Sequence, residues 1–67
     1  MSELLLGRVY KAKSDVSIDD WTPEYIIPEQ STFVNYYDLY DIGKSKLIKI
    51  ALQAEEILEV YELVNDA

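Results

Sequence analysis

The chain has 67 residues, and its 13 acidic and 6 basic side chains give a net charge of −7. It contains no Cys and no His, which excludes disulfides and the usual ligand sets of zinc, haem and iron–sulfur sites. Hydrophobic residues make up 49% of the sequence, too many for a disordered chain. We therefore expect a single folded domain over residues 1–67 that holds no cofactor.

The sequence also predicts a location. The Leu run at residues 4–6 is too short for the apolar region of a signal peptide, and no stretch approaches the roughly 18 apolar residues of a membrane span. Because a chain without Cys does not depend on an oxidising compartment, we expect a cytoplasmic protein, of a cell or of an infected host. The negative net charge argues against direct binding to nucleic acid or to an anionic membrane.

The first half of the chain predicts a strand followed by an irregular segment. Residues 3–13 mix Leu, Val and Tyr with Arg and Lys, as a β-strand does. Residues 14–31 contain both prolines and several Asp and Ser residues, so we expect an irregular connection. Four large apolar side chains should anchor this connection to the core: Trp21, Tyr25, Ile26 and Ile27.

Residues 32–42 are compatible with two structures. Helical spacing would align four aromatic side chains on one side, namely Phe33, Tyr36, Tyr37 and Tyr40. The same segment is rich in aromatic and β-branched residues, which favour strands and have poor helix propensity. The composition slightly favours a Tyr-rich strand, and a short helix stays open.

Residues 45–65 predict a long amphipathic helix. Apolar side chains recur at alternating steps of three and four residues, at Leu47, Ile50, Ala54, Ile57, Tyr61 and Val64. A helix of this length would extend about 30 Å. We therefore expect a small α+β domain: an N-terminal strand, the Pro-containing connection, the Tyr-rich segment and this C-terminal helix.

The charges conflict with that helix. Three lysines would lie at its N-terminal end and two acidic residues at its C-terminal end, so both groups would oppose the helix macrodipole. They are Lys44, Lys46, Lys49, Glu62 and Asp66. Two strands, KLIKIALQ and EILEVYELV, would remove the conflict, but no Gly, Pro or Asn turn separates them and they alternate poorly. We retain the helix.

Along the whole chain, the charges are sorted into blocks. All six cations lie in residues 8–13 and 44–49, while residues 14–43 and 50–67 carry acidic side chains alone. Soluble surfaces usually intersperse the two signs, so this segregation indicates a charged face that binds something. We expect the partner-binding face to be an acidic row on the helix, joined by two upstream residues: Glu55, Glu59, Glu62, Asp66, Asp38 and Asp41.

The leading hypothesis is a small acidic protein–protein interaction module that binds a basic surface of a larger protein. A nucleic-acid-binding protein is the natural target, because a row of carboxylates can imitate backbone phosphates. The size and sorted charge are typical of phage-encoded inhibitors and DNA mimics, and we expect an inhibitor or modulator of that general type.

The rival hypothesis is a structural or assembly subunit. It would form a homodimer, or dock on a partner, through the apolar helix face: Leu47, Ile50, Ile57, Leu58 and Tyr61. We do not expect an enzyme, because so short a chain rarely encloses a catalytic pocket and this one has no His or Cys to act as base or nucleophile.

Overall fold

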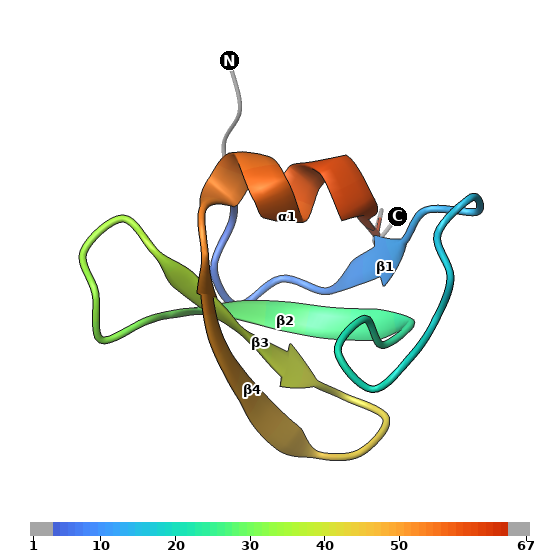
Figure 1. Ribbon diagram of the computed structural model, residues 1–67, viewed down its shortest axis with the longest axis horizontal. Coiled ribbons are helices and arrows are strands. Elements are labelled where there is room, and N and C mark those ends of the chain that lie inside the picture. The colour runs from blue at the N-terminus through green and yellow to red at the C-terminus, as the bar shows by residue number, and fades with distance from the viewer. Residues whose placement is uncertain (1–3, 65–67) are drawn as a thin grey trace.

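The computed structural model describes residues 4–64, which form mostly one five-stranded antiparallel sheet with a single short helix (Figure 1). The strand order is β4-β3-β2-β1-β5, so the last strand returns to pair with the first. The elements along the chain are β1 (Tyr10–Ala12), β2 (Tyr25–Gln30), β3 (Tyr37–Asp41), β4 (Lys46–Leu52), α1 (Ala54–Val60) and β5 (Tyr61–Leu63).

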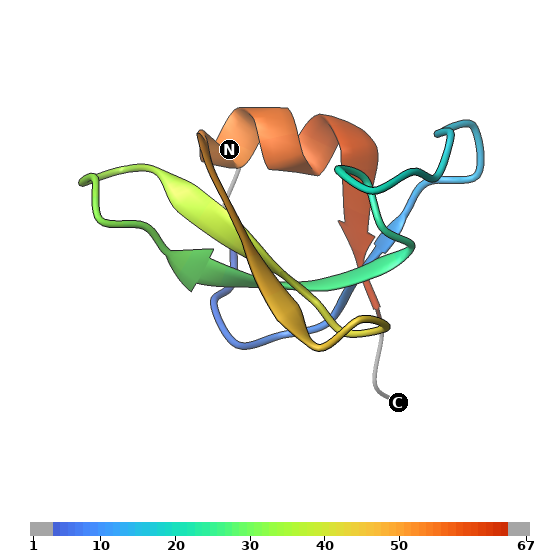
Figure 2. The same cartoon turned by 60° about the horizontal axis from the view of Figure 1, so that its bottom comes forward.

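The sheet is strongly twisted and curves around one core. Figures 1 and 2 show α1 lying across one end of this curved sheet, with the β3–β4 turn at the opposite end. Side chains from four strands and the helix meet inside: Tyr10, Ala12, Ile26, Leu39, Ile57 and Tyr61. Alternation explains the inward positions of β1, since Tyr10 and Ala12 are buried and Lys11 between them is exposed.

The first half of the chain contains two short strands where the sequence indicated one longer strand. The strand expected over residues 3–13 is limited to Tyr10–Ala12 in the described part, and the slightly favoured Tyr-rich strand is confirmed over Tyr37–Asp41. The expected irregular connection ends earlier, because β2 runs through Pro28. Proline has no backbone N–H and cannot donate a ladder hydrogen bond. It is tolerated in β2 because β1 pairs only with Tyr25 and Ile26, so no residue of β1 needs a hydrogen bond from Pro28.

The prediction of a long amphipathic C-terminal helix over residues 45–65 is wrong, and so is the α+β class that includes it. These residues form β4, the seven-residue helix α1 and β5. Gln53 has an extended backbone (φ −78°, ψ 157°) and separates β4 from α1. Pairing of β4 with β3 and of β5 with β1 satisfies backbone groups that a continuous helix would have bonded internally.

This arrangement also removes the charge conflict. Lys46 and Lys49 are exposed on a strand, where no helix dipole acts on them. Glu55 and Glu56 lie in the first turn of α1, where a negative charge is favourable. Glu62 lies beyond the helix, in β5.

Candidate protein-interaction surfaces

The outer face of α1 is acidic. Glu55, Glu56 and Glu59 are all exposed, while Ile57 on the inner side is only 1% exposed and belongs to the core. Within residues 4–64, the one ion pair joins Lys44 to Asp20, so no described cation pairs with these three carboxylates. We call Glu55, Glu56 and Glu59 the α1 acidic face.

The other acidic residues expected in the row do not join this face. Asp38 and Asp41 are buried, 6% and 3% exposed, and both bind backbone amides. The Oδ1 atom of Asp38 accepts a hydrogen bond from the Ala51 amide at 3.1 Å, and Oδ1 of Asp41 accepts one from the Lys44 amide at 3.2 Å. A buried carboxylate that satisfies the backbone stabilises the fold and is not available to a partner.

Glu62 lies in a different environment again. It faces Lys11 across the β1–β5 pair, and the Lys11 ammonium lies 5.8 Å from the centre of the Tyr25 ring. A cation directly opposite on the neighbouring strand offsets the charge of Glu62. Asp66 lies outside the described residues. The structure therefore brings together Glu55 and Glu59 of the expected row, and it adds Glu56.

The residues expected to form an apolar dimer face are dispersed. Ile57 and Tyr61 fill the core, and Ile50 and Leu58 pack partly against it. Leu47 is 38% exposed on β4, away from the helix. These five side chains do not form one accessible surface, and dimerisation itself stays a prediction.

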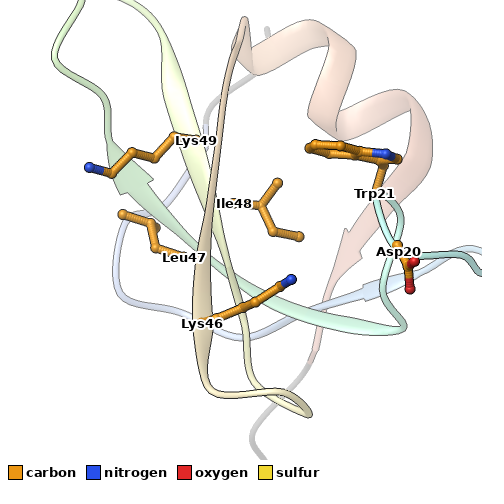
Figure 3. Close-up of a pocket in the computed structure, with 6 residues that line it drawn as sticks. All are labelled: Asp20, Trp21, Lys46, Leu47, Ile48 and Lys49. Carbon is orange, nitrogen blue, oxygen red and sulfur yellow. The ribbon is translucent and has the colours of Figure 1, made fainter.

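A groove of about 380 Å³ lies between the β1–β2 connection and β4 (Figure 3). Trp21, which is 66% exposed, forms one wall, and the buried Ile48 side chain faces it from β4. Lys46 points into the space between them, while Leu47 and Lys49 project on the other face of the strand. Asp20 completes the lining.

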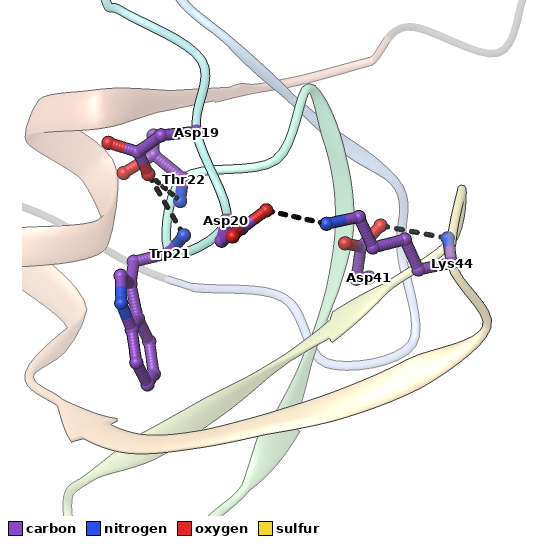
Figure 4. A network of polar contacts seen from close by, with 6 residues as sticks. All are labelled: Asp19, Asp20, Trp21, Thr22, Asp41 and Lys44. Carbon is purple, nitrogen blue, oxygen red and sulfur yellow. Dashed lines mark hydrogen bonds and ion pairs between the residues drawn. The ribbon is translucent and has the colours of Figure 1, made fainter.

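Hydrogen bonds fix the loop that carries Trp21 (Figure 4). Oδ1 of Asp19 accepts hydrogen bonds from the amides of Trp21 at 2.9 Å and Thr22 at 2.8 Å. The backbones of Asp19 and Thr22 bond each other in both directions at 3.1 Å. These are the contacts of an aspartate-centred turn, and they stabilise the loop while the indole stays exposed.

Two further contacts tie this loop to the body of the protein. The Lys44 ammonium lies 2.7 Å from Oδ1 of Asp20, which lowers the pKa of Asp20 and raises that of Lys44. The buried hydroxyl of Tyr61 donates a 2.7 Å hydrogen bond to the Pro23 carbonyl. Burial, with smaller contributions from the Asp41 and Asp19 carboxylates, raises the pKa of Tyr61 to about 12.

Sequence reasoning assigned Trp21 to the core together with Tyr25, Ile26 and Ile27. Ile26 is fully buried, but Trp21 and Tyr25 are exposed. The neighbours of Trp21 contained the missed signal, because an Asp-Asp-Trp-Thr-Pro sequence is typical of a surface turn. A Trp held in such a turn is presented to solvent or to a partner.

Comparisons with protein-family models, curated proteins and solved structures find no match for this chain. In the part of the chain from Leu4 to Val64, no three acidic side chains gather as they would around a metal ion. No helix of that part is long and apolar enough to cross a membrane.

Proposed function

We propose that the protein is a small, non-catalytic protein–protein interaction module whose α1 acidic face binds a basic surface of a larger protein. The observation that carries the proposal is the set of exposed carboxylates on α1, none of which pairs with a cation in residues 4–64. We propose that it acts in the cytoplasm of a cell or of an infected host, as an inhibitor or modulator.

Rigidity supports this proposal. Ile57 anchors the helix in the core, and β5 follows α1 without a linker and pairs with β1. The carboxylates therefore stand on a backbone that needs little ordering when a partner binds, which lowers the entropic cost of association. Because the charges are exposed, they should mainly raise the association rate and the salt dependence of binding.

We propose that the α1 acidic face imitates nucleic-acid phosphates over a single patch, and not along a row. Glu55 and Glu59 are separated by about 6 Å along the helix axis, at 1.5 Å per residue. A helix of seven residues offers this spacing over one patch only. The partner site we propose is thus a small cluster of Lys or Arg side chains on a nucleic-acid-binding protein, and not a long phosphate-binding channel.

A capture experiment with charge-matched variants tests the proposal. The immobilised protein is incubated with a lysate of candidate host cells, next to E55Q/E56Q/E59Q and to the control D15N/E24Q/E29Q. Both variants lose three exposed carboxylates, so they differ in where the charge is removed and not in how much. The captured partner should be lost from the α1 variant and retained by the control.

Two elution steps sharpen the result. Rising NaCl should release the partner steeply, and a short DNA duplex should displace it if the carboxylates occupy a nucleic-acid site. Equal capture by all three proteins, or an affinity that is flat between low and high salt, would contradict the proposal. Circular dichroism first establishes that each variant is folded.

A further inference from the structure

We infer that the groove between Trp21 and β4 binds an extended acidic segment of another protein, which adds to the sheet as a strand beside β4. This goes beyond the proposed function, because the groove and the α1 acidic face are different surfaces with different lining residues. The two surfaces can be tested independently.

The free edge of the sheet is the first argument. β4 lies at one end of the sheet order, so one of its edges pairs with β3 and the other has no strand beside it within residues 4–64. The groove is lined by residues 46–49 of β4 and by the Trp21 loop, with no residue of β3, so it runs along that free edge. An unpaired edge offers backbone amides and carbonyls to an incoming extended chain.

The second argument is the shape of the groove. Trp21 and Ile48 face each other across it, so an apolar side chain that enters the groove would lie between an aromatic and an aliphatic wall (Figure 3). The contacts of Asp19 and the Asp20–Lys44 pair hold the Trp21 loop before any partner arrives (Figure 4). Exposed, pre-positioned Trp residues often supply much of the energy of a protein interface.

The charges around the groove indicate which kind of molecule binds there. Lys46 and Lys49 have no ion-pair partner among the described residues, whereas the one lining carboxylate, that of Asp20, is bonded to Lys44. A second copy of this chain would bring four such lysines onto one short ladder, and like charges there are destabilising. A nucleic acid would be repelled by the net charge of −7. An acidic polypeptide complements both lysines.

The register predicts a sequence pattern for this segment. Residues opposite each other in a ladder share a face of the sheet, and neighbours along a strand alternate faces. The residue beside Ile48 should be apolar, and those beside Lys46 and Lys49 should be acidic. The residue beside the exposed Leu47 is best apolar. The expected core of the segment is therefore acid–apolar–apolar–acid.

The test uses a fluorescein-labelled, end-blocked peptide whose central residues are Glu-Val-Val-Glu, with binding read by anisotropy. Trp21 is the only Trp in the chain, so its fluorescence reports separately on occupancy of the groove. Binding should saturate and change the Trp21 emission. A Lys-Val-Val-Lys peptide should not bind, and N-methylation of alternate backbone amides should abolish binding of the acidic peptide.

Variants place the binding site. K46Q/K49Q should weaken binding about three- to tenfold, while the charge-matched control R8Q/K13Q should leave it little changed. W21A should weaken binding at least about tenfold, and because the indole is exposed this variant should keep its fold. E55Q/E56Q/E59Q should bind the peptide as the wild type does, which separates this inference from the proposed function.

Four results would overturn the inference. They are equal binding of the acidic and basic peptides, binding that survives N-methylation, displacement of the peptide by a tighter-binding single-stranded oligonucleotide, and a dimer that the peptide dissociates. The last two would assign the groove to nucleic acid and to a second copy of the chain, respectively.

Discussion

The Asp38 carboxylate accepts a 3.1 Å hydrogen bond from the Ala51 amide at the point where β3 and β4 fall out of register. Tyr37 pairs with Leu52 and Leu39 with Ile48, so β4 has extra residues opposite Asp38 and forms a bulge. The Ala51 amide is left without a ladder partner, and the side chain of Asp38 takes that place. Ala51 has a positive φ of 53°, which residues other than Gly, Asn and Asp rarely adopt.

Replacing Asp38 by Ala should lower the free energy of unfolding by about 1–3 kcal/mol, because the bulge amide loses its acceptor. Asp38→Asn keeps an acceptor oxygen in the same place and should cost less than half as much. Urea unfolding at neutral pH measures both values. Equal stability of the wild type and Asp38→Ala would mean that solvent replaces this contact without cost.

Replacing Ala51 by Gly should stabilise the protein by about 0.5–1 kcal/mol. The positive φ costs Ala about 1–2 kcal/mol, and Gly adopts it freely but loses about 0.5–1 kcal/mol in entropy on folding. Ala12→Gly, at a buried β1 position without positive φ, serves as the comparison and should destabilise. Thermal unfolding of the two variants distinguishes relief of backbone strain from a general effect of Gly.

Replacing Ile57 by Ala should cost about 2–5 kcal/mol, because this side chain is 1% exposed and lies in the core. Leu58→Ala should cost less, since Leu58 is only partly buried. Neither substitution should change how the unfolding midpoint depends on protein concentration. If Ile57 instead formed a dimer interface, the substitution would leave a folded monomer and the wild-type midpoint would rise with concentration.

Alkaline pH should destabilise the protein through Tyr61. Its pKa rises from 10.0 to about 12 on folding, so below pH 10 the hydroxyl is protonated in both states and its contribution is complete. Between pH 10 and 12 the unfolded chain ionises first, and stability falls by about 1.4 kcal/mol per pH unit for this group. The contribution is lost as the pH passes the folded-state pKa.

Tyr61→Phe isolates this effect from the other tyrosines and lysines. At pH 8 the variant should be less stable than the wild type, because the Pro23 carbonyl loses its hydrogen bond. The difference should shrink between pH 10 and 12 as ionisation penalises only the wild type. A difference that stays constant over this range would show that the Tyr61 pKa is not raised in the folded state.

Sequence reasoning about residues 45–65 failed for an identifiable reason. Apolar positions such as Ile50, Ile57 and Tyr61 fit a helical repeat, but they also suit two strands joined by a seven-residue helix. The sequence did contain evidence against a continuous helix, because three lysines and two acidic residues would oppose its dipole. That conflict can be recognised from neighbouring residues alone. The strand pairing that resolves it joins segments far apart in the chain, such as Tyr10 with Leu63.

In the candidate surfaces, too, some features depend on neighbouring residues and others on distant parts of the chain. The acidic character of residues 55–59 followed from composition. Buried Asp38 and exposed Trp21 did not, because their observed positions invert the usual preferences of Asp and Trp. Each inversion depends on a partner elsewhere: the bulge amide of Ala51 accommodates the carboxylate, and the Asp19 turn and the Asp20–Lys44 pair hold the indole outside.

The sequence by itself determined the absence of disulfides and the sorted charges, and it favoured the Tyr-rich strand and the turn chemistry around Asp19, because these depend on residue identity and near neighbours. Only the tertiary structure decided that residues 45–65 form a strand, a short helix and a strand, and that a groove with a free strand edge lies beside Trp21. Both depend on which strands pair, and antiparallel pairing satisfies backbone hydrogen bonds between segments that no local pattern connects.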